Sequence, residues 1–308
     1  MTLHAGLDMG GTNLRIGIVE GTRVIHQQRF HADFARLCRE NNPDVAWPII
    51  VETLAGSLQE VLQAHPEVVS IGIGFPGFVD STNGIVLQSP NLPGLYQVNV
   101  AADVSAKIGR PVVVENDAAA AAYGEYRLSP GRGGSLVYIG LGTGVGGGLV
   151  LDGRPYTGER GAAMEVGHLI VAYGDNARPC GCGNRGCLEQ YAAAGGVTLS
   201  YKLAAGVELN SVEIANLARS GDEKALAAYR LAGTCLAQAI AHLAKVLDVG
   251  HVVIGGGLSN AWVLMQEAFY DQLNNSLIPA LRKNIGIRIS TSGDEAGIIG
   301  SALLAAEL

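Results

Sequence analysis

Three of the five cysteines lie within eight residues of one another, in a spacing that suits a metal site. The segment CGCGNRGC contains Cys180, Cys182 and Cys187, and His168 precedes it in the chain. Three thiolates and one imidazole complete the tetrahedral coordination of Zn²⁺ and leave no open position. Soft sulfur ligands also favour zinc over magnesium or calcium. The pattern therefore predicts a structural zinc ion; the alternative is a group of reduced cysteines without a metal.

Two glutamates stand just outside this ligand set. Glu165 precedes His168 by three residues, and Glu189 follows Cys187 by two. A bound metal would fix both carboxylates in space. Fixed carboxylate acceptors suit a ligand that carries several hydroxyl groups.

A glycine-rich turn near the start of the chain is a candidate phosphate site. It contains Asp8, Gly10, Gly11, Thr12 and Asn13. The two glycines allow the backbone to approach a ligand and to turn amide groups toward an anion. The carboxylate could hold Mg²⁺ or a water bound to it. The alternative is an ordinary hairpin turn with a capping aspartate.

A second turn of the same kind contains Gly142, Thr143 and Gly144. It has no lysine, so it is not a Walker A loop, and it leads into a strand, which argues against a Rossmann fingerprint. Two such turns could hold a polyphosphate from both sides.

A third glycine cluster follows an apolar strand pattern at 251–254 and consists of Gly255, Gly256 and Gly257. It could let an adenine ring lie against the backbone. The alternative is a strand-to-helix turn.

Asn116 and Asp117 follow a buried strand pattern and begin a helical one. Either residue could simply cap the helix. The functional interpretation places a carboxylate at the carboxyl edge of a sheet, where α/β proteins bind ligands. There it could accept a proton from a hydroxyl group, an effect worth ~10²–10⁴ in rate.

These residues must be positioned by regular structure, and the first part of the chain alternates strand and helix patterns. Apolar spacing and turn residues predict strands at 3–8, 14–20, 23–30, 68–74 and 111–115, helices at 44–64, 99–109 and 117–127, and a loop region between residues 77 and 99.

The second part opens with another meander and is then mostly helical. The expected strands are 136–141, 148–151, 251–254 and 286–290, and the expected helices are 186–194, 210–219, 222–247 and, in pieces, 260–280. The pattern of a strand, a Gly-Thr turn and a second strand occurs at Gly11-Thr12 and again 131 residues later at Gly142-Thr143. This recurrence predicts an internal duplication with a weak sequence signal. Chance similarity among glycines is the alternative.

Composition limits the partners. The chain has 308 residues, 48% of them hydrophobic, with 21 Lys and Arg against 28 Asp and Glu. An apolar chain of low charge can fold, so disorder is excluded. A net charge of −7 without a basic run argues against nucleic acid. Because cations are scarce, an anionic ligand would depend on backbone amides and a metal.

No membrane association or export is expected. The sequence contains no apolar run of 18 residues, and its N-terminus lacks the features of a signal peptide. We therefore expect a cytoplasmic protein.

Five motifs occur in one order along the chain: DxGGT from Asp8, ENDA from Glu115, LGTGxGGG from Leu141, ExGH from Glu165 and CxCGxxGCxE from Cys180. Together they resemble the ROK (repressor, open reading frame, kinase) family of bacterial sugar kinases, and the resemblance covers nearly the whole chain. The zinc motif after ExGH is highly specific, whereas the glycine motifs are shared with other actin-like ATPases.

The resemblance implies an α/β, actin-like ATPase (ribonuclease H-like) fold with two lobes and an interdomain cleft that binds ATP and a hexose. The small lobe would comprise residues 1–117, completed by a C-terminal helix at about 296–308. The large lobe would comprise residues 118–295 and carry the zinc motif.

The resemblance also assigns roles. Asp117 would be the catalytic base that deprotonates the sugar 6-hydroxyl, and His168 would bind sugar through one ring nitrogen and zinc through the other. The first two glycine turns, with Asp8, would carry the phosphates and Mg²⁺. The remaining sugar contacts would come from Asn116, Glu165 and Glu189, and more weakly from Asn91 and the Gly77 backbone.

Within the family, the sequence is most similar to glucokinases. N-acetylmannosamine kinases often lack the glutamate that is present here at position 165. Two departures, Ala119 in place of a common asparagine and Met164 in place of a common glycine, leave fructose, allose and N-acetylglucosamine open as substrates. The family's repressors carry a DNA-binding domain before the first glycine turn, and a start at residue 8 leaves no room for one. The resemblance further implies a homodimer.

Overall fold

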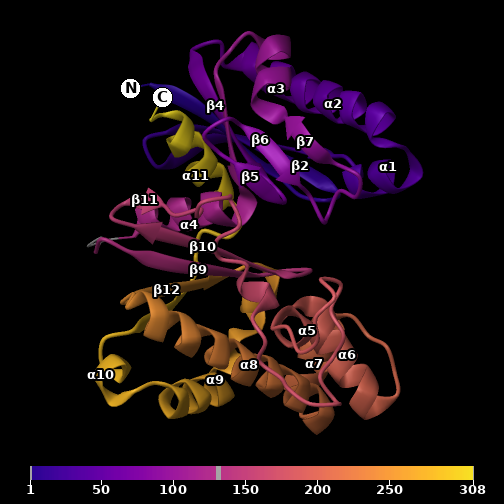
Figure 1. Ribbon diagram of the computed structural model, residues 1–308, viewed down its shortest axis with the longest axis vertical. Helices are drawn as coiled ribbons and strands as arrows, with labels where there is room; N and C mark the ends of the chain where they lie inside the picture. The colour runs from indigo at the N-terminus through magenta and orange to yellow at the C-terminus, as the bar shows by residue number, and fades with distance from the viewer. Residues whose placement is uncertain (1, 130–132, 308) are drawn as a thin grey trace. The chain divides into compact units, whose positions relative to one another are not determined.

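The computed structural model describes residues 2–129 and 133–307 (Figure 1). The chain divides into two compact units. Unit 1 comprises residues 1–134, 148–163 and 294–308, and unit 2 comprises residues 135–147 and 164–293.

Unit 1 is built on a five-stranded sheet with the strand order β3-β2-β1-β4-β8. Its strands are β1 (Leu3–Met9), β2 (Asn13–Glu20), β3 (Arg23–His31), β4 (Val68–Phe75) and β8 (Val112–Asn116). The first three form an antiparallel meander, whereas β4 pairs in parallel with both β1 and β8. The parallel strands are therefore near-continuous apolar runs, as expected when both faces are covered.

In its described residues, unit 1 has five helices. They are α1 (Phe34–Glu40), α2 (Pro43–Ala64), α3 (Val100–Ile108), α4 (Asp117–Leu128) and α11 (Glu295–Ala305). α4 packs against β4 and α11 and groups with unit 1, whereas the resemblance implied a lobe boundary at residue 117.

Among the described residues, one helix, α2, is long and apolar enough to cross a membrane by length and composition, but half of that apolar stretch is buried inside the protein. Its buried stripe includes Ile50, Leu54 and Leu58, each fully enclosed in the core of unit 1. A core helix of a soluble protein passes the same test, so α2 is weak evidence for a membrane span.

Glycine lets the C-terminal helix α11 approach unit 1 at backbone distance. A Cβ atom at Gly6 of β1 would collide with the carbonyl of Ile298, and one at Gly72 of β4 would collide with that of Ser301. The same conflict would arise between Gly124 of α4 and the Ala296 carbonyl. Part of the high glycine content of the chain is therefore explained by this one packing interface.

A small antiparallel sheet occupies the region that the sequence predicted to be a loop. Its strands are β5 (Phe78–Asp80), β6 (Ile85–Gln88) and β7 (Tyr96–Asn99), in the order β5-β6-β7. The prediction was wrong here because strands of three or four residues are too short to show an alternating pattern. The prolines and glycine that predicted a loop lie in the turns between them.

A second sheet has the order β11-β10-β9-β12-β13. Its strands are β9 (Leu136–Leu141), β10 (Val145–Leu151), β11 (Arg154–Pro155), β12 (His251–Gly255) and β13 (Gly286–Ile289). β12 runs parallel to both β9 and β13, and the division between the units falls within β10. The order repeats that of the first sheet, so the predicted duplication is confirmed at the level of topology.

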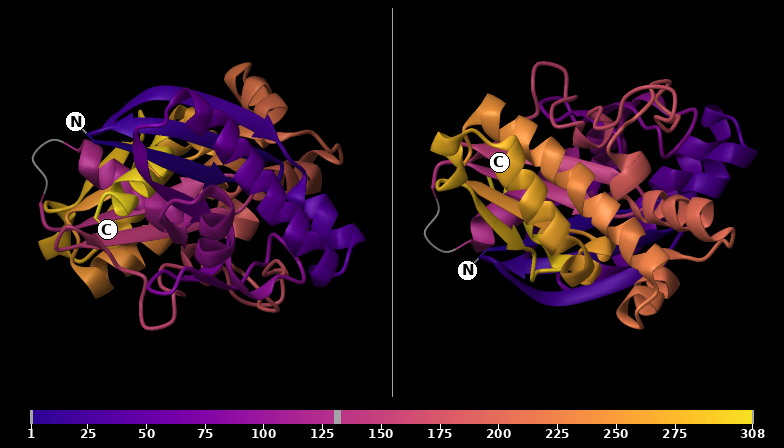
Figure 2. Two further views of the ribbon diagram at one scale, coloured as in Figure 1. Left: turned by 90° about the horizontal axis from the view of Figure 1, so that it is seen from above. Right: turned by 90° about the horizontal axis from the view of Figure 1, so that it is seen from below.

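The helices of unit 2 follow in sequence. They are η1 (Val166–His168), α5 (Glu189–Ala192), α6 (Ala194–Ala205), α7 (Ser211–Arg219), α8 (Glu223–Leu247), η2 (Gly257–Ala261), α9 (Trp262–Ser276) and α10 (Pro279–Arg282). The two longest, α8 and α9, pack side by side (Figure 2). α5, α6 and α7 also contact α8, so this helix is the centre of the helical layer.

Candidate functional site

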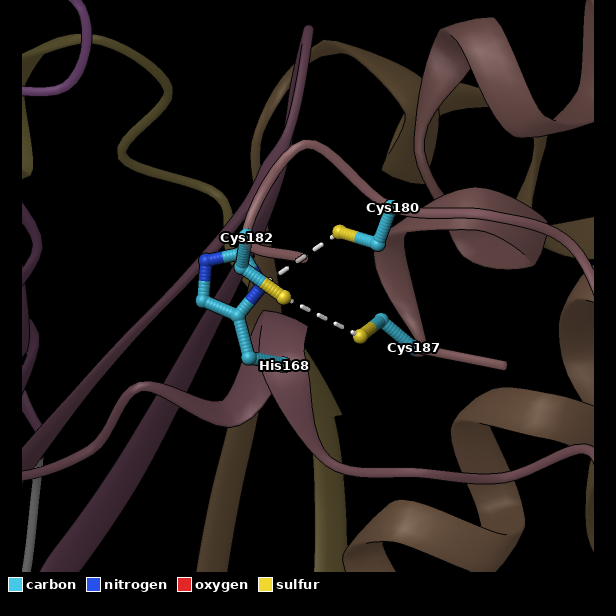
Figure 3. Close-up of side chains that lie close together, drawn as sticks. All are labelled: His168, Cys180, Cys182 and Cys187. Atoms are coloured by element: carbon cyan, nitrogen blue, oxygen red, sulfur yellow. Dashed lines mark hydrogen bonds between the residues drawn. The ribbon is translucent and has the colours of Figure 1, made fainter. Parts of the chain in front are cut away.

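His168, Cys180, Cys182 and Cys187 form one cluster in unit 2, with their ligand atoms all within 4.8 Å of one another (Figure 3). The Cys182 and Cys187 sulfurs are 3.6 Å apart, and the Cys180 sulfur lies 3.7 Å from His168 Nδ1. The four residues that the sequence singled out are therefore brought together.

The spacing fits zinc. Zn–S bonds of about 2.3 Å at a tetrahedral angle separate two sulfurs by about 3.8 Å, which is close to the separations seen here. All five cysteines of the chain are free thiols. Burial raises the pKa of the Cys187 thiol to about 12, so a cation is needed to hold that residue as a thiolate ligand.

The chain around the cluster is held by backbone pairing. We call residues 173–187 the cysteine loop. Leu188 N–H donates to Leu169 C=O, and Val171 N–H donates to Gly186 C=O, so the segment after η1 pairs with the end of this loop. At the tip of the loop, Gly183 N–H donates to Cys180 C=O. These contacts set the distance between His168 and the thiols.

Two carboxylates flank His168 on opposite sides of its ring. Glu189 Oε1 lies 3.9 Å from Nδ1 and accepts a hydrogen bond of 3.2 Å from the Cys180 thiol. Glu165 Oε2 lies 3.8 Å from Nε2. Partial burial raises the pKa of Glu165, with a further rise from the charge of Glu189 and a lowering by His168. Nδ1 therefore faces the sulfurs and Nε2 faces away, toward Glu165.

Asp117 opens α4 at the carboxyl end of the parallel strand β8. Asn116 caps the helix, because its Oδ1 accepts from Ala119 N–H at 2.9 Å. Its Nδ2 donates to the Gly77 carbonyl, also at 2.9 Å. The structure thus brings Gly77, Asn116 and Asp117 together, with a carboxylate at the edge where α/β proteins bind ligands.

Asn91, the other residue assigned to sugar on that side, is exposed in the turn between β6 and β7. No hydrogen bond of its side chain fixes it among the described residues.

Asp8 lies near the end of β1, and its carboxylate is paired with the guanidinium of Arg15. Arg15 Nη1 donates to Asp8 Oδ2 at 2.9 Å and lies 3.0 Å from Asp294 Oδ1. Burial raises the pKa of Asp8, and the Arg15 charge opposes that rise. In the turn, Gly10 N–H donates to Asn13 C=O at 2.8 Å, so that amide is used inside the hairpin.

In the same turn, Asn13 Nδ2 donates to the Thr12 hydroxyl, and the threonine is exposed. Gly11 is half-buried and its carbonyl accepts from Ala35 N–H. The exposed hydroxyl and its glycine neighbours remain the side of this turn that can face an anion.

The second glycine turn contacts the metal region directly. Gly142 C=O accepts from Ala194 N–H at the start of α6. A Cβ atom on Gly144 would come within 3.1 Å of Glu189 Oε2. Thr143 between them is exposed. In unit 2 the candidate phosphate turn and the candidate sugar carboxylate are therefore neighbours.

The third glycine cluster has structural reasons for part of its composition. Gly256 has φ of +81°, and a Cβ atom there would press on the backbone of Leu141, while one on Gly255 would meet Tyr138. Gly257 begins η2 with open space around it. The strand-to-helix turn is thus present whether or not it holds a nucleotide.

Sequence reasoning assigned no role to three residues that shape these sites. Glu115 is buried, and its Oε1 accepts from Asn116 N–H at 2.7 Å. Arg15 could have been found, because a hairpin centred between Gly11 and Thr12 pairs position 8 with position 15. Arg178, which lies in the cysteine loop, makes contacts that have no local sequence signal.

Comparison with known proteins decides the family. The ROK family profile matches residues 4–308. The chain belongs to the ROK family. A glucokinase from Thermotoga maritima is 31% identical over 317 residues, covering 98% of this chain and 96% of the relative. An N-acetyl-D-glucosamine kinase from Salmonella newport is 30% identical, covering 98% and 99% of the two chains.

A solved structure extends the similarity to three dimensions. The ROK family glucokinase from Streptomyces griseus, determined in complex with glucose and AMPPNP, matches with a TM-score of 0.83 at 29% identity and covers 99% of this chain and 100% of that chain. The α/β, actin-like ATPase fold predicted from the sequence is confirmed.

Proposed function

We propose that this ROK protein is an ATP-dependent sugar kinase that transfers the γ-phosphoryl group to the 6-hydroxyl of glucose. The observation that carries the proposal is Asp117 at the carboxyl end of β8, beside Asn116, whose amide is anchored on the Gly77 carbonyl. The glucokinase from Thermotoga maritima supports glucose as the substrate.

Asp117 acts as the general base. As the sugar O6 attacks Pγ, the carboxylate takes the hydroxyl proton, the O6–Pγ bond forms and the bond from Pγ to the β,γ-bridging oxygen breaks, releasing ADP. Asn116 orders the first turn of α4 through its cap, so the base is carried on a rigid helix start. Positioning and charge stabilisation account for most of the catalysis of phosphoryl transfer.

The nucleotide phosphates are bound by the two Gly-Thr turns. The hydroxyls of Thr12 and Thr143 and the turn amides other than those of Gly10 and Gly142, which are used inside the turns, provide donors without a lysine. Mg²⁺ would neutralise phosphate charge when it is bound, and Asp8, which accepts a hydrogen bond from Arg15, would hold it or its water.

The sugar is recognised in unit 2 by the carboxylates around His168. Glu165 and Nε2 of His168 face the same side, away from the sulfurs. Zinc bound to Nδ1 and the three thiolates would supply a fixed scaffold and no open coordination position. The imidazole then presents Nε2 to a hydroxyl group, and Glu189 stays beside it.

N-acetyl-D-glucosamine is the second candidate substrate. The kinase from Salmonella newport is about as similar to this chain as the glucokinase is. Fructose, allose and N-acetylmannosamine complete the set of sugars to be tested.

The deciding experiment measures ADP release with each sugar, with and without Mg²⁺, and identifies the product by ³¹P NMR. We expect glucose 6-phosphate to form at the highest kcat/KM and only with Mg²⁺ present. If a different sugar gives the highest kcat/KM, glucose specificity is wrong. If none of the sugars is phosphorylated with any nucleotide, the kinase assignment is wrong.

Assembly and location complete the proposal. We infer a cytoplasmic homodimer whose ligands are a sugar and a nucleotide, not nucleic acid. Five free thiols fit a reducing compartment, and a net charge of −7 does not fit a nucleic-acid surface. Sedimentation at the mass of a single chain would contradict the dimer.

A further inference from the structure

We propose that Arg178 is a positioning residue that clamps the cysteine loop onto the break between α5 and α6, and so keeps the metal cluster and the Glu189 carboxylate at a fixed spacing. The consequence for sugar affinity rests on the proposed function. The clamp itself does not, because it can be measured through the metal.

The guanidinium of Arg178 reaches two helices. Nη1 donates to Gln190 C=O at 2.6 Å and to Gly196 C=O at 3.1 Å, and Nη2 donates to the Ser200 hydroxyl at 2.9 Å. The carbon at its centre lies 4.4 Å from the centroid of the Tyr191 ring. A planar fork with several donors matches this set of acceptors and stacks on the ring, which an ammonium group cannot do.

The Gln190 carbonyl is available to Arg178 because α5 and α6 are separated by a break in the helix. α5 ends at Ala192, Ala193 is extended, and α6 begins at Ala194. In a continuous helix Ala194 N–H would donate to Gln190 C=O, but here it donates to Gly142 C=O instead. The Gln190 carbonyl is therefore an orphan of a helix end, and Arg178 satisfies it with a charged donor.

The backbone of Arg178 links α5 to the other end of the cysteine loop. Its N–H donates to the Tyr191 hydroxyl at 3.0 Å, and its carbonyl accepts from Gly186 N–H at 2.8 Å. One residue thus joins both arms of the cysteine loop to the first turns of α5 and α6.

The functional residues lie next to this clamp. Cys180 is two residues after Arg178, and Glu189 is the residue before Gln190. Their side chains meet, since the Cys180 thiol donates to Glu189 Oε1 at 3.2 Å. If the clamp opens, the loop and α5 can separate, and both the ligand cluster and the carboxylate lose their spacing.

The test compares Arg178→Lys with the wild type and with Arg185→Lys. Arg185 is an exposed arginine of the same loop whose Nη2 reaches the Asp175 carbonyl at 3.3 Å. Each protein is loaded with Zn²⁺, and the rate of metal transfer to a chromogenic chelator is measured. KM for glucose, KM for ATP and kcat are then determined on the loaded proteins well below their melting temperatures.

We expect Arg178→Lys to release Zn²⁺ roughly tenfold faster and to raise KM for glucose by roughly tenfold, the loss expected from one charged hydrogen bond. KM for ATP should rise clearly less than KM for glucose, because the phosphate turn is in contact with α6 only through Gly142 C=O among these bonds, and Arg185→Lys should match the wild type. If the lysine variant does not fold, Tyr191→Phe, which removes the hydroxyl that accepts from Arg178 N–H, should show the same changes at smaller size.

Unchanged metal release would overturn the clamp, even if the melting temperature falls. Faster release with an unchanged KM for glucose would overturn the positioning of Glu189. Equal rises in both KM values would also overturn it, because a general loss of structure would explain them. If the wild type phosphorylates no sugar while the release rates differ as expected, the clamp stands and the proposed function fails.

Discussion

The buried carboxyl of Glu115 makes a pH-dependent prediction about stability. Glu115 is 5% exposed and lies directly before Asn116 and Asp117. Burial raises its pKa from 4.5 to about 7, although hydrogen bonds from Asn116 N–H and the Ser81 side chain oppose the rise. The perturbation is Glu115→Gln, which keeps an oxygen that can accept from Asn116 N–H and removes the charge.

The sign follows from proton uptake. Below about pH 4.5 the carboxyl is protonated in both folded and unfolded chains, so burial carries no charge penalty. Between about pH 4.5 and 7 the unfolded chain releases this proton and the folded chain keeps it, so the free energy of unfolding falls as pH rises. Above about pH 7 the carboxyl is ionised in both folded and unfolded chains. The difference between a pKa of 4.5 and about 7 then lowers the free energy of unfolding by about 3 kcal/mol.

The assay is urea unfolding of unit 1 across this pH range. The chain has two tryptophans, and Trp47 lies in α2 of unit 1. In a Trp262→Phe background, fluorescence therefore reports unit 1 alone. The free energy of unfolding of the Gln variant should gain about 3 kcal/mol over its parent between about pH 4.5 and 8.

Glu159→Gln, a substitution at an exposed residue of unit 1, is the matched control. The difference between variant and parent cancels every other titrating group. A difference that stays constant with pH, or that falls as pH rises, would refute the argument that Glu115 is protonated by burial.

Three further predictions concern the site and the packing. Asp117→Asn should lower kcat by ~10²–10⁴ and leave sugar affinity by calorimetry nearly unchanged; a loss below about tenfold would reduce Asp117 to a helix cap. Cys182→Ser should lower zinc content, melting temperature and sugar affinity, with a smaller effect on nucleotide affinity. Elemental analysis that finds no zinc in the wild type, with three titratable thiols in the native state, would contradict the metal site. Gly124→Ala places a Cβ against the Ala296 carbonyl and should destabilise the protein by about 1–3 kcal/mol, whereas Gly56→Ala, in open space on α2, should be neutral or stabilising in urea unfolding.

Sequence predicted the parts of the fold whose signal is local. Strand patterns of six or more residues gave β1, β2 and β3 within one residue at each end. The metal cluster was also predicted, because three ligands lie close together in the chain and backbone turns hold them there.

Features that depend on distant partners were not predicted. The expected helix at 186–194 begins at Glu189, because the preceding residues pair with the segment after η1, and its break at Ala193 depends on Gly142 and Arg178. The small sheet β5-β6-β7 was missed because its strands gain their stability from pairing, not from periodicity.

The packing of α11 against Gly6, Gly72 and Gly124 has a consequence for folding during synthesis of the chain. A ribosome delivers residues 1–134 first, but the helix that covers β1 and β4 comes from residues 295–305. Until that helix emerges, the surface of β1 and β4 that α11 covers stays exposed, and an exposed apolar surface is prone to aggregation. Glu307 is also anchored, since its carboxylate accepts a hydrogen bond from the Tyr123 hydroxyl. A purification tag is therefore better tolerated before β1 than after α11. A chain truncated before α11 should keep the core that the first sheet forms with α2 but leave exposed the surface of β1 and β4 that α11 covers.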